Sequence, residues 1–159
     1  QSSYIHAVRA PPLPSMNIFT PPEISMPSPC EAGGLGCFCN GVPASVNQHA
    51  TIEGSYLTSS GLSPWSDDEL LRAKRAGFNL RTWGDGYGYV LVATGRVEAM
   101  YDPKAELYDV APMPVILAEA GGRFTDINGD PSPDRGSGLA TNGLVHDETL
   151  AILRGEHPG

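Results

Sequence analysis

Two aspartates stand seven positions apart, where a chain of alternating strands and helices would form a site. Asp102 ends the apolar segment VEAMYD, and Asp109 lies in AELYDVAPMPVILAEAGGRFTD, residues 105–126. Ligand sites in open α/β sheets gather at the carboxyl ends of strands. A carboxylate at a strand end and another at the next helix start could therefore face one crevice, where hard cations such as Mg²⁺ take oxygen ligands.

Each aspartate also has a purely structural interpretation. A helix is expected over 107–120, and Asp109 would lie in its first turn, where the dipole favours an anion by roughly 0.3–1 kcal/mol. Asp102 could cap the turn that follows it. Pro114 conflicts with this helix, because an interior proline costs about 3 kcal/mol unless it still lies in the first turn. The residues alone leave cap and ligand open.

A third group, Gly84, Asp85 and Gly86, lies at an expected strand-to-helix junction. The N–H groups at a helix start can receive a phosphate. Turn chemistry explains the same three residues equally well.

Two further metal patterns are rejected. The segment 126–138 begins like a calcium loop, but it has proline where the loop needs glycine and serine where it needs glutamate. Cys37 and Cys39 near His49 lack the spacing and the second ligand pair of a zinc site.

The composition excludes several classes of protein. The formal net charge is −8 and only 10 of the 159 residues are Lys or Arg, so neither a phosphate backbone nor an anionic membrane is a favoured partner. No apolar run approaches the roughly 20 residues of a membrane span, and no signal segment opens the chain. The odd count of three cysteines argues against a disulfide framework, so a cytoplasmic location is expected.

The chain divides into three parts. Residues 1–29 hold seven prolines and no glycine, which predicts an extended or disordered leader. Residues 30–50 contain an Asn-Gly pair between short apolar segments, which is typical of a β-hairpin. Residues 51–157 alternate between expected strands and helices, which predicts an α/β layered domain. The expected strands are 51–60, 78–84, 97–102, 122–126 and 138–143, and the expected helices are 67–76, 86–95, 107–120 and 146–154.

Three segments taken in order carry a family resemblance. The chain resembles the C-terminal half of the inositol monophosphatase family, most closely its histidinol-phosphatase branch. The resemblance lies in the segments RTWGDGYGYVLVATGRVEAMYDP, LYDVAPMPVILAEAGGRFTD and LATNGLVHDETL. The likeness runs from about residue 34 to 153, and GLGCFCNG resembles the last hairpin of the family's N-terminal sheet. The resemblance implies the C-terminal α/β half of an αβαβα sandwich, with that hairpin left over from the N-terminal domain.

The resemblance also implies roles for the residues above. Asp109 falls on the acid of the Trp-Asp-x-Ala motif, which coordinates catalytic Mg²⁺, with Tyr108 in place of the tryptophan. Asp102 falls on an acid that contacts substrate hydroxyl or amino groups. Gly84, Asp85 and Gly86 fall on the substrate loop, which is one residue shorter here than in inositol phosphatases.

The expected function follows from these positions. The resemblance implies Mg²⁺-dependent hydrolysis of a small phosphorylated metabolite, with histidinol phosphate of histidine biosynthesis favoured, and a homodimer in the complete protein. The family's Gly-Glu-Glu and Asp-Pro-x-Asp-Gly-Thr motifs are absent, so catalytic residues are unassigned and this chain alone is expected to be inactive or nearly so. Alternatives are a phosphatase for inositol phosphate, fructose bisphosphate or a nucleotide 3′-phosphate, and a non-catalytic relic or binding module.

Overall fold

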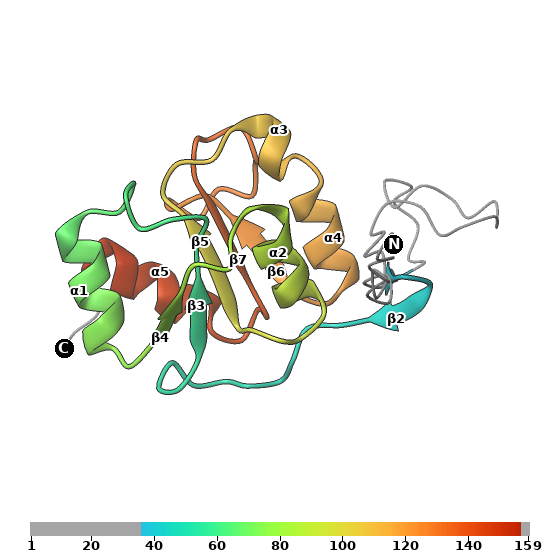
Figure 1. Ribbon diagram of the computed structural model, residues 1–159, viewed down its shortest axis with the longest axis horizontal. Helices are drawn as coiled ribbons and strands as arrows, with labels where there is room; N and C mark the ends of the chain where they lie inside the picture. Colours follow the sequence, from blue (N-terminus) through green and yellow to red (C-terminus); the bar gives the residue numbers. More distant parts are fainter. Residues whose placement is uncertain (1–35, 157–159) are drawn as a thin grey trace, which may run out of the picture.

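A five-stranded mixed β-sheet forms the centre of the computed structural model, which describes residues 36–156 (Figure 1). Helices α2 and α4 cover one face of the sheet, and α1 and α5 cover the other (Figure 1). The strand order is β4-β3-β5-β7-β6. The sheet strands are β3 (Tyr56–Thr58), β4 (Asn79–Arg81), β5 (Ala99–Asp102), β6 (Arg123–Thr125) and β7 (Gly138–Thr141). The helices are α1 (Asp67–Arg75), α2 (Asp85–Ala93), α3 (Leu107–Val110), α4 (Met113–Glu119) and α5 (His146–Arg154).

Three neighbouring strands of the sheet run in the same direction. β3 pairs in parallel with both β4 and β5, whereas β7 pairs antiparallel with β5 and β6. The carboxyl ends of β3, β4 and β5 therefore meet at one edge of the sheet. The predicted α/β fold class is confirmed.

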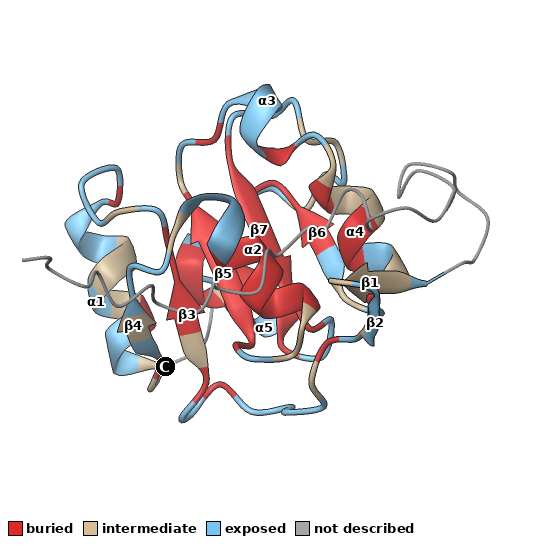
Figure 2. Cartoon of the chain, turned by 45° about the vertical axis from the view of Figure 1, so that its right-hand side comes forward, coloured by how far each residue is buried: buried red, intermediate tan, exposed pale blue. Residues whose placement is uncertain are grey.

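Strand β5 is buried on both faces and is coloured as buried in Figure 2. Ala99 and Tyr101 pack in the cluster beneath α1 and α5, and Met100 packs in the cluster beneath α2. The sequence over 97–102 alternates Val97, Ala99 and Tyr101 with Glu98, Met100 and Asp102, yet all six residues are buried, because helices cover both sides of this central strand.

The prediction of a single helix over 107–120 is wrong, because the chain forms two helices there, α3 and then α4. A proline has no N–H to donate and its ring clashes with the preceding turn. Pro112 therefore ends the first helix and becomes the N-cap residue of the second. Pro114 lies in the first turn of α4, where no N–H is needed and the proline is tolerated.

The other expected elements are present with shorter strands. The capping box of Ser66 and Glu69 opens α1, as the sequence predicts. Helices α2 and α5 lie where they were expected. The strand expected over 51–60 is reduced to three residues, because the segment before it forms turns.

The predicted hairpin is present as β1 (Cys37–Cys39) and β2 (Val42–Ala44). Asn40 and Gly41 both have positive φ, as a tight hairpin turn requires. The Gly36 N–H donates to a carboxylate oxygen of Glu119 in α4, which ties the hairpin to the sheet's helical layer. The predicted leader, residues 1–29, lies outside the described residues.

His146 is a buried polar residue at the start of α5. Its ring lies between the hydroxyls of Thr125, 3.0 Å from Nε2, and Thr141, 2.9 Å from Nδ1. Thr125 donates its proton to the carbonyl of Asp126, and Thr141 accepts from the Gly143 N–H. This assigns the neutral ring with Nε2–H donating and Nδ1 accepting. Burial, followed by the nearby Arg123 charge, lowers the pKa of His146 to about 4.

Stability is expected to fall as pH drops from 6.5 toward 4. The unfolded chain protonates this histidine near pH 6.5 and the folded chain only near 4, so the unfolded state binds more protons in this window. The full effect is about 3 kcal/mol. Urea unfolding at successive pH values should show this slope, and it should persist in His49→Gln, because His49 is exposed. An equal slope in His146→Gln would contradict the assignment.

Candidate functional site

Asp102, the last residue of β5, is 7% exposed and has three donors around its carboxylate, with the Ser59 hydroxyl close by. Ser60 donates its N–H to Oδ1 and its hydroxyl to Oδ2, both at 2.8 Å. The Tyr89 hydroxyl donates to Oδ2 at 3.2 Å, and the Ser59 hydroxyl lies 3.2 Å from Oδ1 and 3.0 Å from the Gly61 carbonyl oxygen. A buried carboxylate is costly unless donors surround it. The donors here join two segments of the chain, the loop after β3 and helix α2, to the end of β5.

The loop after β3, residues 59–66, is anchored at its far end as well. The Trp65 indole N–H donates to the Ser59 hydroxyl at 2.9 Å, and its ring meets Tyr101 edge-on with centroids 4.9 Å apart. The Tyr101 hydroxyl in turn donates to the Glu69 carboxylate of the capping box at 2.9 Å. These contacts hold the loop in place at the sheet's carboxyl edge.

The segment between β4 and α2 is clamped to the same loop. Thr58 Oγ1 bonds both the N–H and the carbonyl of Trp83, at 2.8 and 3.0 Å. Gly84 lies so close to Ser60 that an added Cβ would overlap the serine backbone. The Asp85 N–H donates to the Ser60 hydroxyl at 2.8 Å, and Asp85 has a φ of 55°, in the left-handed region.

Ser60 therefore joins three of the five predicted site residues. Asp102, Gly84 and Asp85 all contact it. Gly86 lies one residue further along α2, exposed, and a Cβ there would meet open space. The prediction that this helix start receives a phosphate remains a prediction, although the Asp85 N–H is already used by Ser60.

Asp109 lies in α3, exposed, and its carboxylate has no hydrogen-bonding partner among residues 36–156. It does not cap its helix, since α3 has no side-chain cap. The pKa of Tyr89 is raised well above its usual value by burial, then by the charge of Asp102, and also by the charge of Asp109. The two aspartates thus act on one tyrosine, and Asp109 has an unused carboxylate at this end of the molecule.

Ser60 and Tyr89 were not identified from the sequence. The signal for Ser60 was a run of three hydroxyl residues, 58–60, at the end of an expected strand. Tyr89 stands four residues after Asp85, so both follow one side of a helix. Neither pattern is specific enough to predict a site by itself.

The described part of the chain does not by itself suit a magnesium ion. Among residues 36–156 no three side chains of the types His, Cys, Asp and Glu come together in a group that could hold a metal. Asp109 could supply one oxygen ligand, and Mg²⁺ binds a lone carboxylate weakly. Within the same range no helix is long and apolar enough to cross a lipid bilayer.

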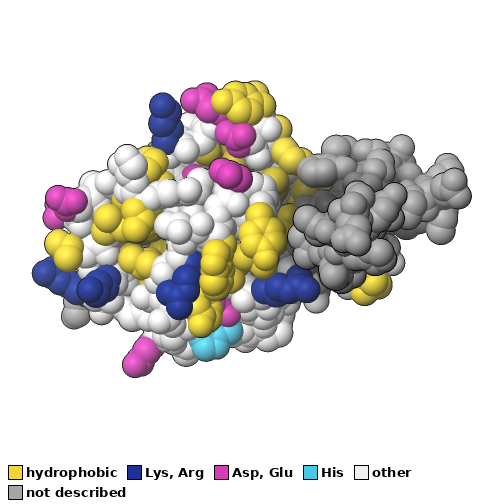
Figure 3. All heavy atoms as spheres, in the orientation of Figure 1, with side chains coloured by type: hydrophobic (Ala, Val, Ile, Leu, Met, Phe, Trp, Pro, Cys, Tyr) yellow, Lys and Arg dark blue, Asp and Glu magenta, His cyan; other side chains and the backbone are white. Residues whose placement is uncertain are grey.

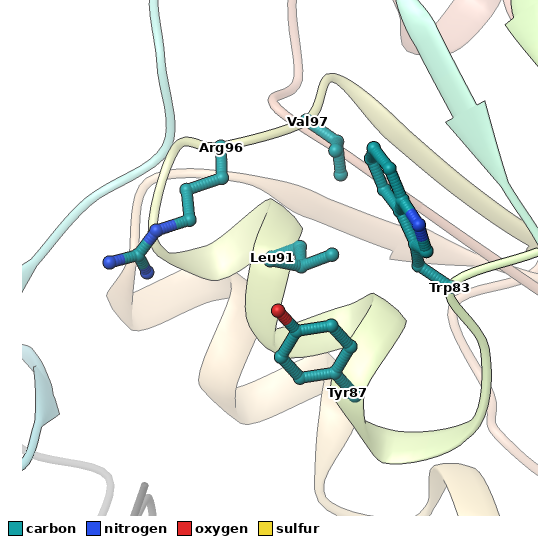
Figure 4. A pocket seen from close by; sticks show the side chains of 5 residues that line it. All are labelled: Trp83, Tyr87, Leu91, Arg96 and Val97. Atoms are coloured by element: carbon teal, nitrogen blue, oxygen red, sulfur yellow. The ribbon is translucent and has the colours of Figure 1, made fainter. Parts of the chain in front are cut away.

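A separate hollow lies along the flank of α2 (Figure 4). It has a volume of about 410 Å³ and is lined by Trp83, Tyr87, Leu91, Arg96 and Val97. In Figure 3, apolar side chains gather beside basic ones on the face of the molecule in view. None of the predicted site residues lines this hollow.

The comparison with known families decides the identity of the fold. Residues 29–158 match the inositol monophosphatase family. The chain belongs to this family. The matched region includes the whole sheet, Ser60 and both aspartates, so these residues form part of an inositol monophosphatase fold.

Individual relatives agree with this membership. The chain is 37% identical over 112 residues to the histidinol-phosphatase of Streptomyces coelicolor, covering 68% of this chain and 42% of that protein. It is 38% identical over 114 residues to the histidinol-phosphatase of Mycobacterium tuberculosis, covering 69% and 44%. Human inositol monophosphatase 1 is 33% identical over 107 residues, covering 62% and 39%. The chain thus spans less than half the length of these curated relatives.

Solved structures give the same fold. The inositol monophosphatase from Anabaena (Nostoc) sp. PCC 7120 superposes with a TM-score of 0.67 at 26% identity, covering 79% of this chain and 55% of that one. An IMPase/NADP phosphatase complexed with NADP and Ca²⁺ gives a TM-score of 0.66 at 19% identity, covering 75% and 47%, and supports the fold alone.

The close packing at Gly84 leads to a matched pair of substitutions. Gly84→Ala should lower the free energy of unfolding by about 2 kcal/mol or more, because the new methyl group overlaps the backbone of Ser60. Gly86→Ala should be neutral or stabilising, because its Cβ meets open space within a helix. Urea denaturation measures both. Equal effects of the two substitutions would contradict the packing described.

Proposed function

We propose that these residues form the leaving-group side of a phosphate monoester hydrolase that acts on histidinol phosphate. The observation that carries the proposal is the buried Asp102 carboxylate held by Ser60 at the edge where β3, β4 and β5 end. Such an edge is the usual ligand site of an α/β sheet. Family membership supports the reaction class, and the two histidinol-phosphatases support the substrate.

The chemistry of this edge suits an amino alcohol. Histidinol phosphate carries an ammonium, which donates hydrogen bonds, next to the ester oxygen that becomes the hydroxyl of the leaving alcohol. Asp102 and Asp109 contribute negative charge here, and the hydroxyl of Ser60 offers an oxygen acceptor. Phosphoryl transfer depends mainly on positioning and on neutralising charge, so holding the alcohol in place is a direct contribution to the reaction.

The phosphate side of the site requires residues beyond those described. We propose Mg²⁺ as the ion of the complete protein, with Asp109 as one of its ligands. One carboxylate is insufficient, so the chain alone should have little or no activity. We further propose a cytoplasmic, homodimeric protein, as expected from the resemblance.

A chimera tests this function. The N-terminal part of the Streptomyces coelicolor histidinol-phosphatase would be joined to residues 34–156 at the β1–β2 hairpin. The chimera should hydrolyse histidinol phosphate in the presence of Mg²⁺, and prefer it to inositol 1-phosphate, whereas residues 1–159 alone should release no phosphate above background. Equal turnover by residues 1–159 alone would contradict the proposal of an incomplete site.

Asp109→Asn in the chimera should reduce kcat/KM on the order of 100-fold, because the carboxylate charge is removed from the metal site. Glu106→Gln is the matched control, since Glu106 is an exposed acid at the start of the same helix. It should change the rate less than about twofold. Equal effects of the two substitutions would exclude a specific role for Asp109.

A non-catalytic binding module is the second candidate. It is favoured by the absence, among residues 36–156, of any group that could hold a metal. A chimera that folds and lacks turnover on every phosphate ester of a substrate panel, including fructose bisphosphate and nucleotide 3′-phosphates, would favour this alternative.

The β1–β2 hairpin should make the isolated chain self-associate. Among residues 36–156 it is a two-stranded sheet with an exposed Val42, and such a sheet is marginal unless further strands pair with it. Light scattering should detect species larger than a monomer, and Val42→Lys should reduce their fraction. A monodisperse monomer of the unmodified chain would contradict this expectation.

A further inference from the structure

The hollow along the flank of α2 takes no part in the proposed reaction. Its volume of about 410 Å³ falls within the roughly 300–1,000 Å³ of ordinary ligand pockets. The rings of Trp83 and Tyr87 lie around the Leu91 side chain (Figure 4). Trp83 and Tyr87 are 42% and 53% exposed. The molecule therefore presents two aromatic rings and an aliphatic side chain in one shallow site.

Two arginines flank this hollow. Arg96 lines it, and the Arg81 guanidinium lies 5.7 Å from the centre of the Trp83 ring. Among residues 36–156 neither arginine forms a salt bridge, since Arg96 donates to the Thr94 hydroxyl and Arg81 to the Leu80 carbonyl. Such a surface is complementary to an apolar ligand that carries a negative charge.

The proline-rich leader, residues 1–29, contains a segment with both of these properties. Proline-rich segments dock on aromatic-lined grooves, because their polyproline II conformation is preformed and little entropy is lost on binding. The leader has two Pro-Pro pairs, at 11–12 and 21–22. Glu23 is its one acidic residue and directly follows the second pair. Residues 21–23 therefore combine apolar rings with a negative charge.

The described chain begins close to the hollow. Cys37, the first residue of β1, pairs with Ala44, the last residue of β2. Ser45 comes next, and its carbonyl oxygen would lie only 2.8 Å from a Cβ added at Gly95. Gly95 precedes Arg96 in the chain. The hairpin that follows the leader is thus packed beside one wall of the hollow.

The leader is long enough, and its attachment makes a weak contact effective. Glu23 precedes Cys37 by 14 positions, which span up to roughly 43 Å in a polyproline II chain. A tethered segment meets its site at an effective concentration in the millimolar range. A second molecule at micromolar concentration meets the same hollow far less often. The leader of the same chain is therefore the occupant that these observations favour.

We propose that the hollow along α2 is the docking site of the chain's own leader, with Pro21 and Pro22 on the rings of Trp83 and Tyr87. The Glu23 carboxylate lies beside the flanking arginines. The contact covers both exposed rings and gives these cations an acidic partner. It does not depend on the phosphatase reaction.

Nuclear Overhauser contacts in the isotope-labelled 159-residue chain test the docking. Ring protons of Trp83 should show contacts to ring protons of Pro21 or Pro22. The Trp65 indole is the internal control, because its N–H donates to Ser59 and its ring does not line the hollow. An isotope-filtered measurement on mixed labelled and unlabelled chains should show no contact of Trp83 with a second chain.

A matched pair of double substitutions separates residues 21–23 from proline content in general. Pro21→Ala with Pro22→Ala removes ring methylenes from the contact and should lower the ratio of docked to undocked chain about tenfold or more. The chemical shift of the Trp83 indole N–H reports this ratio. Pro11→Ala with Pro12→Ala, which changes the pair without a following acid, should leave that shift unchanged.

Charge substitutions test the polar part of the contact. Arg96→Gln should lower the docked-to-undocked ratio about two- to fivefold, because an exposed ion pair is weak. Glu23→Gln should have a similar effect alone and little further effect in the Arg96→Gln variant. Arg75→Gln is the control, since Arg75 is exposed at the end of α1 on the other face of the sheet. Amide exchange of the core residue Val92 checks that every variant is folded.

The contradicting outcomes are specific. The absence of contacts between Trp83 and the leader in the folded, unmodified chain would overturn the proposal. Trp83 contacts that arise only between labelled and unlabelled chains would identify a second copy as the occupant and overturn it as well. An unchanged Trp83 indole shift in the Pro21→Ala, Pro22→Ala variant would do the same. Each of these results leaves the proposed phosphatase function standing.

Discussion

One buried carboxylate holds the candidate site together. Asp102 ends the central strand β5, and its donors come from the loop after β3 and from helix α2, which follows β4. The parallel arrangement of β3, β4 and β5 brings these segments to one edge, and the carboxylate fixes their relative positions. The cost of burying its charge is offset only while all of these donors stay in place. The same interaction that stabilises the edge therefore determines its geometry.

We propose that residues 36–156 orient one side of a ligand. They provide a fixed hydroxyl, a charged group behind that hydroxyl and one unused carboxylate, that of Asp109. The same residues 36–156 provide no metal-binding group. The chain spans 42% and 44% of the lengths of the two histidinol-phosphatases compared above.

Much of the architecture could be predicted from the sequence, since its signals are local. The capping box of α1 and the Asn-Gly hairpin depend on a few adjacent residues, and both are confirmed. The break between α3 and α4 was missed because the cost of Pro112 and Pro114 depends on where a helix starts. The burial of β5 on both faces was missed because it depends on which helices pack against the sheet.

The site was predicted only in part for the same reason. Asp102, Gly84 and Asp85 stand out by residue type and by place, and the structure brings them together. A serine is too common a residue type for Ser60 to stand out in the sequence. Its place in the candidate site comes from contacts with Asp85 and Asp102, 25 and 42 positions away. Such contacts cannot be read from spacing along one chain.

The most direct measurement is a crystal structure of the protein with Mg²⁺ and histidinol phosphate. The ligand should lie at the shared carboxyl edge of β3, β4 and β5, with its amino alcohol beside Ser60 and Asp102 and its phosphate toward Asp109. A ligand bound instead in the hollow between Trp83 and Tyr87, with the Ser60–Asp102 contact unchanged and no ligand beside it, would contradict the account.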